Sequence, residues 1–300
     1  MLSSFVHWNW DPVMFSIGSF AVRWYSVGFL CAFAFSYLIL YHVLKREKVR
    51  SEYLDYLTVY VFLGVLIGAR LGHCLFYEPD YFLTSEHFGE IVWPFRNGHY
   101  TGFTGLASHG AAIGVLTALC LYGRRYRINL WWVLDRLVIV VALGGAFVRL
   151  GNLCNSEIYG HATSLPWGFI FEREGETLPK HPTQLYEAFA YFLIFAVCLW
   201  RYLHTKGLFK SGTILGWWFV ALFGVRFLIE FVKNDQVGFE AGMSLNMGQL
   251  LSLPFILGGL VIAWFGHRNR FPREPFPHGE VKTIVAKWDQ KAAQEKQKKK

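Results

Sequence analysis

The chain has 300 residues, of which 54% are hydrophobic and only 17% are charged, and its mean hydropathy is +0.30. Soluble domains carry about 25% charged residues, and the apolar runs here are too long for strands or ordinary core helices. The composition therefore excludes a water-soluble fold and predicts an all-α, polytopic membrane protein. The net charge of +8 comes from clusters beside the apolar runs and from a basic tail, so no folded face for nucleic acid is predicted.

About 20 apolar residues are needed for a helix to cross the hydrocarbon layer. The sequence predicts seven such helices, at residues 24–44, 54–76, 106–122, 130–150, 185–203, 213–232 and 247–265. Asp135 and Arg136 fall within the first two turns of the fourth, where we expect them to reach toward the headgroups.

Basic residues predict the orientation, because short cytoplasmic loops are rich in Lys and Arg. They follow the first, third, fifth and seventh spans, as in the run Lys45, Arg46, Lys48 and Arg50, whereas the opposite loops contain few. We expect the N-terminus outside and the C-terminus in the cytoplasm. The predicted organisation is a seven-helix catalytic domain over 1–266, with a small outer cap of loops at about 151–184, and a basic cytoplasmic tail over 267–300.

Ionisable side chains within spans are costly, and each is a candidate for function. Six polar groups from five predicted helices share one depth near the outer side: Tyr25, Arg70, His109, Arg149, Arg226 and Glu230. Guanidinium groups at that depth form a receptor for phosphate, because Arg binds phosphate through paired hydrogen bonds. The natural anion there is a phospholipid headgroup.

Simpler interpretations stay open for each group. Arg226 and Glu230 are spaced i to i+4 and can neutralise each other. The run from Arg149 to Glu157, which contains Asn152 and Asn155, can be the polar end of a helix. His109 can be a packed, hydrogen-bonded residue rather than a base.

The run Gly145 to Glu157, centred on Arg149-Leu150-Gly151-Asn152, resembles the signature of bacterial prolipoprotein diacylglyceryl transferases. Other blocks of that family appear in the same order: Arg23-Trp24-Tyr25, Gly68-Ala69-Arg70-Leu71-Gly72, Ser108-His109-Gly110, His181-Pro182-Thr183-Gln184-Leu185-Tyr186-Glu187, Arg226-Phe227 with Glu230, and Met247-Gly248-Gln249. The resemblance extends to about Phe265. Ala69, Leu222 and Lys233 depart from the family pattern.

The resemblance implies transfer of the diacylglyceryl group of phosphatidylglycerol to the lipobox cysteine thiol of a preprolipoprotein, at the outer face of the bacterial inner membrane. The implied partners are phosphatidylglycerol, the lipobox peptide and membrane lipid, with no cofactor and no metal. The expected catalytic residues are His109, Arg149 and Arg226. The expected substrate-binding residues are Tyr25, Arg70, Asn152, Asn155, Glu157, Gly160 and Glu230.

Two other classes of membrane protein also fit seven spans. A transporter or lipid flippase for an anionic substrate would carry ionisable groups inside its bundle, although near the midplane and on broken helices. A seven-helix receptor would have an outside N-terminus. The ordered motifs favour the transferase.

Overall fold

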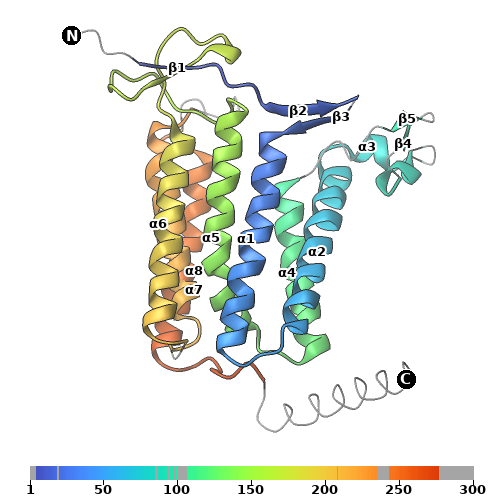
Figure 1. The fold of residues 1–300 in the computed structure, drawn as a ribbon, viewed down its shortest axis with the longest axis vertical. Helices are drawn as coiled ribbons and strands as arrows, with labels where there is room; N and C mark the ends of the chain where they lie inside the picture. Colours follow the sequence, from blue (N-terminus) through green and yellow to red (C-terminus); the bar gives the residue numbers. More distant parts are fainter. Residues whose placement is uncertain are drawn as a thin grey trace. The chain divides into compact units, whose positions relative to one another are not determined.

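The computed structural model describes residues 5–18, 20–84, 87–93, 95–96, 99–100, 107–207, 209–234 and 243–276, and it is mostly helical (Figure 1). The chain divides into two compact units, which we describe separately. The first consists of Met1–Val43 and Trp131–Arg273, and the second of Leu44–Leu130 and Glu274–Lys300. Most of the predicted tail, residues 277–300, lies outside the described residues.

Among the described residues, six helices are long and apolar enough to cross a membrane. They are α1 (Trp24–Arg46), α2 (Glu52–Phe76), α5 (Leu130–Cys154), α6 (Thr183–His204), α7 (Thr213–Ile229) with its 3₁₀ extension η3 (Glu230–Val232), and α8 (Met247–His267). The helix expected at 106–122 is present as α4 (Ser108–Tyr126) but is not among the six. Polar and basic residues at its two ends, including His109, Arg124 and Arg125, lower its apolar content.

Helix α5 is the most enclosed helix of the first unit. Half of its apolar window is buried, against 22–33% for the other five candidate spans. Helix α1 packs closely on it, since a Cβ added at Gly28 would lie 3.3 Å from the Phe147 carbonyl oxygen. Helix α7 contacts both α6 and α8, and a Cβ at Gly216 would lie 2.5 Å from the Ala263 nitrogen of α8. Small residues thus bring these backbones together, as is typical of membrane helices.

Asp135 and Arg136 do not reach toward the headgroups, and that prediction is wrong. Asp135 is completely buried, and its carboxylate accepts hydrogen bonds from the backbone N–H groups of Gly212 (2.6 Å) and Leu215 (2.9 Å). These groups belong to the start of α7, where N–H groups lack partners within the helix. The aspartate is therefore a cap supplied by a neighbouring helix, with a charge that suits the positive end of the α7 dipole.

The second unit is built on the pair α2 and α4. Gly64, Gly68 and Gly72 of α2 face Gly110 and Gly114 of α4 so closely that a Cβ at any of the five would overlap the opposite backbone. Short elements follow α2 in this unit: α3 (Pro79–Phe82), η1 (Phe88–Ile91), β4 (Phe95–Arg96) and β5 (His99–Tyr100).

Short strands, which the sequence analysis does not foresee, extend the first unit beyond its helices. Strand β1 (Val6–Trp8) pairs in parallel with β6 (Phe169–Phe171), while β2 (Val13–Ile17) and β3 (Phe20–Arg23) form a hairpin leading into α1. The indole of Trp8 donates to the Leu153 carbonyl oxygen at 3.0 Å. The N-terminal segment is thereby joined to the end of α5 and to the segment between α5 and α6, which also contains η2 (Glu172–Glu174).

The Asp135 cap generates a prediction about stability. Asp135→Ala leaves buried N–H groups of α7 unpaired, which costs about 1–3 kcal/mol per group. We expect a lower thermal unfolding midpoint in detergent, with Asp135→Asn intermediate because it keeps one acceptor oxygen. A midpoint equal to that of the unsubstituted chain would contradict the capping role.

Candidate active site

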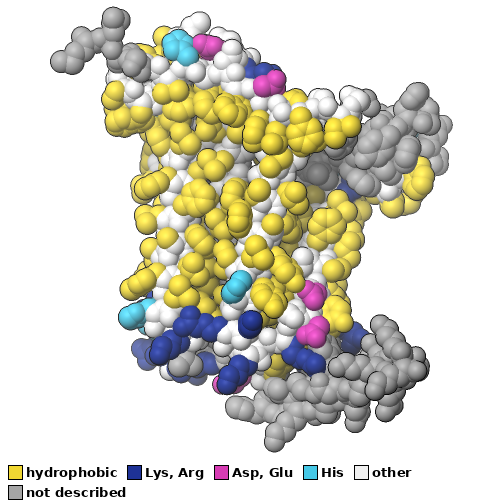
Figure 2. Space-filling view, viewed as in Figure 1, with side chains coloured by type: hydrophobic (Ala, Val, Ile, Leu, Met, Phe, Trp, Pro, Cys, Tyr) yellow, Lys and Arg dark blue, Asp and Glu magenta, His cyan; other side chains and the backbone are white. Residues whose placement is uncertain are grey.

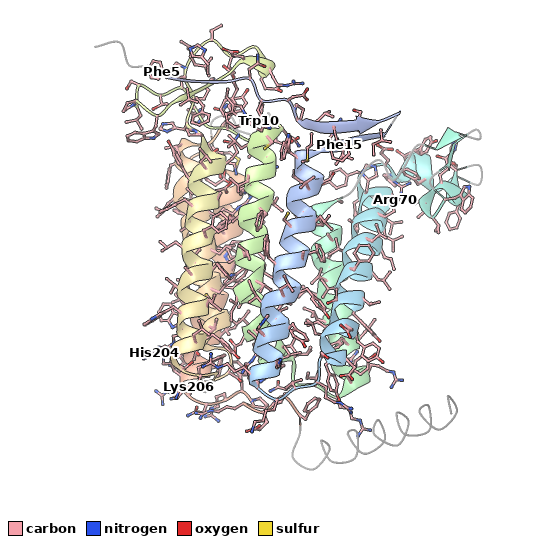
Figure 3. The ribbon with its side chains drawn as sticks, in the orientation of Figure 1. Phe5, Trp10, Phe15, Arg70, His204 and Lys206 are labelled. Atoms are coloured by element: carbon pink, nitrogen blue, oxygen red, sulfur yellow. The ribbon has the colours of Figure 1, made fainter. Side chains whose placement is uncertain are left out.

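Polar side chains from four helices meet at one end of the first unit. They come from the last turns of α5, the second turn of α6, the end of α7 with η3, and the residue that precedes α8. Figure 3 shows Phe5 and Trp10 at this end of the unit, and His204 and Lys206 at the other. Arg149, Arg226 and Glu230, which the sequence predicts to share one depth, therefore lie at the same end of this unit.

Arg149 is the centre of the first group of contacts. Its Nε lies 2.7 Å from Oε2 of Glu187, and its Nη1 donates to Oδ1 of Asn152 at 3.2 Å. Asn152 in turn donates to Oε1 of Glu157 at 2.7 Å, and Asn155 donates to the same oxygen at 3.2 Å. The run that the sequence left open as a polar helix end is a continuous hydrogen-bonded chain that holds the guanidinium of Arg149.

Glu230 is the centre of the second group. Its Oε1 lies 3.6 Å from Nη2 of Arg226 and 3.1 Å from Nζ of Lys233, and its Oε2 accepts from Asn246 at 3.1 Å. The carboxylate also fills the space above Gly248, where a Cβ would lie 2.5 Å from its Cδ. Arg226 is the more accessible of the two site guanidiniums, with a side chain 33% exposed against 14% for Arg149.

Lys233 connects the two groups. Its side chain is almost fully buried, and Nζ lies 3.7 Å from Oε1 of Glu187 as well as beside Glu230. Around these two buried carboxylates stand three cations, Arg149, Arg226 and Lys233, so the cations outnumber by one the carboxylates that they contact directly. A third carboxylate, that of Glu157, is exposed and is joined to Arg149 through Asn152. This local excess of positive charge, next to the partly exposed Arg226, favours an anionic ligand.

Sequence reasoning missed Glu187 as a site residue, although it stands in a quoted motif. Its side chain is completely buried, and its contacts with Arg149 and Lys233 are ion pairs without aligned hydrogen bonds. The available signal was its position, a carboxylate in the first turns of a predicted span. Lys233 and Asn246 were also given no role, because neither lies within a predicted span.

Two further expected residues act through close packing. The ring of Tyr25 lies against Gly151, where a Cβ would come within 2.6 Å of its Cδ2. Gly160 donates its N–H to the His181 carbonyl oxygen at 2.9 Å, and a Cβ there would overlap the Val232 carbonyl oxygen. A side chain at either glycine would push apart the segments that hold the site.

His109 and Arg70 belong to the second unit, so the structure does not relate them to Arg149. His109 is exposed in the first turn of α4. Arg70 is buried; its Nε donates to the Ile91 carbonyl oxygen at 3.1 Å and its Nη2 to that of Glu90 at 2.7 Å, with Phe82 below it at 4.8 Å. It holds η1 and α3 against the end of α2. Their roles at the site stay predictions, whereas the other eight expected residues lie together in the first unit.

The segment between α5 and α6 places one titratable pair beside the site. Burial, and then the neighbouring His161, lower the pKa of His181. Its Nδ1 lies 3.2 Å from the hydroxyl of Tyr186, which accepts from the indole of Trp167 at 2.9 Å. Trp167, Tyr186 and His181 therefore form a short hydrogen-bonded chain. Among the described residues, no group of three or more His, Cys, Asp or Glu side chains is arranged to hold a metal ion.

Comparison with known proteins agrees with this geometry. The sequence model of the family described as "Prolipoprotein diacylglyceryl transferase" matches residues 12–265. Curated relatives named phosphatidylglycerol–prolipoprotein diacylglyceryl transferase include one from Bacteroides fragilis, 39% identical over 265 residues, which are 87% of this chain and 95% of the relative. Another, from Tolumonas auensis, is 42% identical over 256 residues, 85% of this chain and 95% of the relative.

The position of Glu187 generates a prediction. Glu187→Gln removes one of two buried counter-charges, and breaking a buried ion pair costs about 3–5 kcal/mol. We expect a clear fall in the thermal midpoint in detergent. Glu172→Gln is the matched control, because that carboxylate is 39% exposed and pairs only with His7 among the described residues. Equal midpoints for the two variants would show that the buried network does not depend on Glu187.

Proposed function

The chain belongs to the prolipoprotein diacylglyceryl transferase family, and we propose that it transfers the diacylglyceryl group of phosphatidylglycerol to the lipobox cysteine of a preprolipoprotein. In this reaction the cysteine sulfur attacks the glycerol carbon that carries the phosphate. The carbon–oxygen bond breaks, a thioether forms, and glycerol phosphate leaves with the bonding electrons. The observation that carries the proposal is the excess positive charge around Arg149 and Arg226.

The guanidiniums stabilise the leaving group in this proposal. The phosphate of phosphatidylglycerol is a diester with one negative charge, and it becomes a monoester with a second charge as the carbon–oxygen bond breaks. Arg149 and Arg226 are held in advance by Glu187 and Glu230, so little reorganisation is needed when that charge develops. Arg also binds phosphate oxygens in pairs, which orients the ester for attack.

The remaining residues of the first unit position the substrates. Asn152, Asn155 and Glu157 form the hydrogen-bonding chain next to Arg149 and bind the glycerol hydroxyls. Glu230 orients Arg226. Tyr25 and Gly160 form the edges of the space for the lipid and the peptide.

The thiol also loses a proton before it attacks. A cysteine thiol has a pKa near 8.5 and reacts as the thiolate, so a histidine with a pKa near 6.5 is a suitable base. We assign this role to His109, whose exposure in α4 leaves it accessible. The alternative is that His109 binds the headgroup and water accepts the proton. Arg70 assists by holding the segment that follows α2.

We place the site at the outer leaflet of a bacterial inner membrane, with seven spans, an outside N-terminus, a cytoplasmic C-terminus and the segment 151–184 as an outer cap. Basic residues support this orientation, because Arg201, Lys206 and Arg268 lie at helix ends of the first unit opposite the site. In Figure 2 Lys and Arg side chains gather at the lower end of the view, below helices covered with hydrophobic side chains. Helix α4, with 19 residues, is about 28 Å long at 1.5 Å per residue, close to the thickness of about 30 Å that a span crosses.

A transporter or flippase is not favoured. Its ionisable groups belong near the midplane on broken helices, whereas the site residues of the first unit lie at helix ends. Family membership also supports a transferase.

The proposal predicts a covalent product. Purified protein incubated with phosphatidylglycerol and a synthetic peptide carrying a lipobox cysteine should increase the peptide mass by one diacylglyceryl group, with one glycerol phosphate released. Arg149→Ala should lower the rate by about 10²–10³, as expected for loss of a donor that stabilises developing charge. Folded protein that gives no mass increase, or an Arg149→Ala variant of equal rate, would refute the proposal.

The assignment of the base predicts a pH dependence. His109→Gln should lower the rate at pH 7 by about 10²–10⁴, and the residual rate should rise with pH up to about 8.5 as the free thiol ionises. The unsubstituted enzyme should instead depend less steeply on pH over this range, because its own base accepts the thiol proton. Turnover near normal at pH 7 in the variant would remove the base assignment and favour proton loss to water.

A further inference from the structure

An apolar groove between α6 and α7 extends from Arg201, at the end of α6 opposite the site, to Ala190 and to Val225, the residue before Arg226. Its volume is about 620 Å³, within the range of about 300–1,000 Å³ that small ligands occupy. Its walls are formed by hydrophobic side chains of the two helices, among them Ala190, Leu193, Val197, Ile214, Trp217 and Ala221. One charged residue lines it, Arg201.

The length of the groove matches one leaflet of a bilayer. Along α6 its lining runs from Ala190 to Arg201, which is about 16 Å at 1.5 Å per residue. Half of a hydrocarbon layer of about 30 Å is about 15 Å. Since Arg201 lies in the last turn of α6 and Glu187 near its first, the groove begins in the leaflet opposite the site, and its other end, at Ala190 and Val225, approaches the site.

The Arg201 end has the character of a membrane interface. Trp200, beside Arg201, is 61% exposed, and Trp217 at the start of α7 is 53% exposed. Tryptophan concentrates at headgroup depth. The side chain of Arg201 is itself exposed and has no side-chain partner within the described part of the chain.

The surrounding charge favours an anion. Lys206 is exposed just beyond α6, and Lys210 donates to the His267 carbonyl oxygen at 2.8 Å. The carboxylate in this part of the first unit, Asp135, is buried and already bound to the start of α7. A phosphate at Arg201 would therefore meet cations rather than a competing carboxylate.

We propose that the groove binds an anionic phospholipid of the leaflet opposite the active site, with an acyl chain along α6 and α7 and the phosphate on Arg201. The lipid is a resident ligand and not the substrate, because its phosphate lies on Arg201, in the last turn of α6, whereas Glu187 and Arg149 lie at the other end of that helix. It holds together two helices whose other ends supply Glu187 and Arg226. The proposal requires that the chain span a bilayer and does not depend on the transferase reaction.

Photocrosslinking of the full chain in lipid nanodiscs tests this site. Phosphatidylglycerol with a diazirine in its acyl chain is irradiated, and labelled peptides are mapped by mass spectrometry. We expect saturable labelling within residues 190–201 and 214–225 that unlabelled phosphatidylglycerol displaces, and several-fold less labelling by the matching phosphatidylcholine probe.

Three variants sharpen the test. Arg201→Gln should lower groove labelling several-fold by removing the phosphate contact. Ala221→Phe should lower it by filling the groove while Arg201 stays in place. Arg268→Gln is the matched control, because Arg268 lies at the same end of the unit but does not line the groove, and its labelling should equal that of the unsubstituted chain. Thermal midpoints verify that each variant is folded.

Two results would overturn the proposal. Labelling that rises in proportion to the probe concentration and is unchanged in Arg201→Gln would mean that only bulk lipid contacts this face. Crosslinks from the groove to a second copy of the chain would mean that a protein surface covers it. Peptide lipidation is measured in parallel, so failure of this proposal is distinguishable from failure of the proposed reaction.

Discussion

The buried carboxylate of Glu187 is the constraint on which the active-site end of the first unit depends. It lies between Arg149 of α5 and Lys233 beyond α7, so three segments far apart in the sequence meet on two oxygen atoms. A fully buried carboxylate persists only when cations or hydrogen bonds compensate it. The same contacts that stabilise Glu187 therefore hold a guanidinium in place for an anionic ligand, and structure and chemistry share one set of ion pairs.

Close helix packing makes this arrangement possible. Glycine and alanine let α1 approach α5 and let α7 approach α8, which brings short polar contacts within reach at the helix ends. Opposite the site, Asp135 serves a comparable purpose, because its carboxylate joins α5 to the start of α7. Helix α5 is thus fixed to its neighbours by one charged residue toward each end, and its middle is apolar and buried. The buried charges of α5 therefore lie at positions where fixed partners compensate them.

How much the sequence predicts differs between elements. The apolar runs predict the long helices well, because a backbone in lipid must satisfy its own hydrogen bonds; α4 is among the helices predicted, although its polar ends leave it outside the six candidate spans. The confirmed family motif identifies Arg149, Asn152, Asn155 and Glu157, which are near in sequence and join through short-range hydrogen bonds. The strands β1 and β6 escape prediction, because three-residue segments show no clear alternation and their pairing joins residues more than 160 positions apart.

The sequence by itself determined the membrane class, the family and the residue types proposed to bind a phosphate, since these follow from local composition and ordered motifs; the spacing of Arg226 and Glu230 also predicted their pairing. Only the tertiary structure decided that Glu187 accompanies Arg149 and Lys233. The physical reason is that the interaction of charges depends on distance and burial, and both are set by how helices remote in sequence pack together. The same is true of Asp135, whose partners belong to another helix and are invisible in its own sequence surroundings.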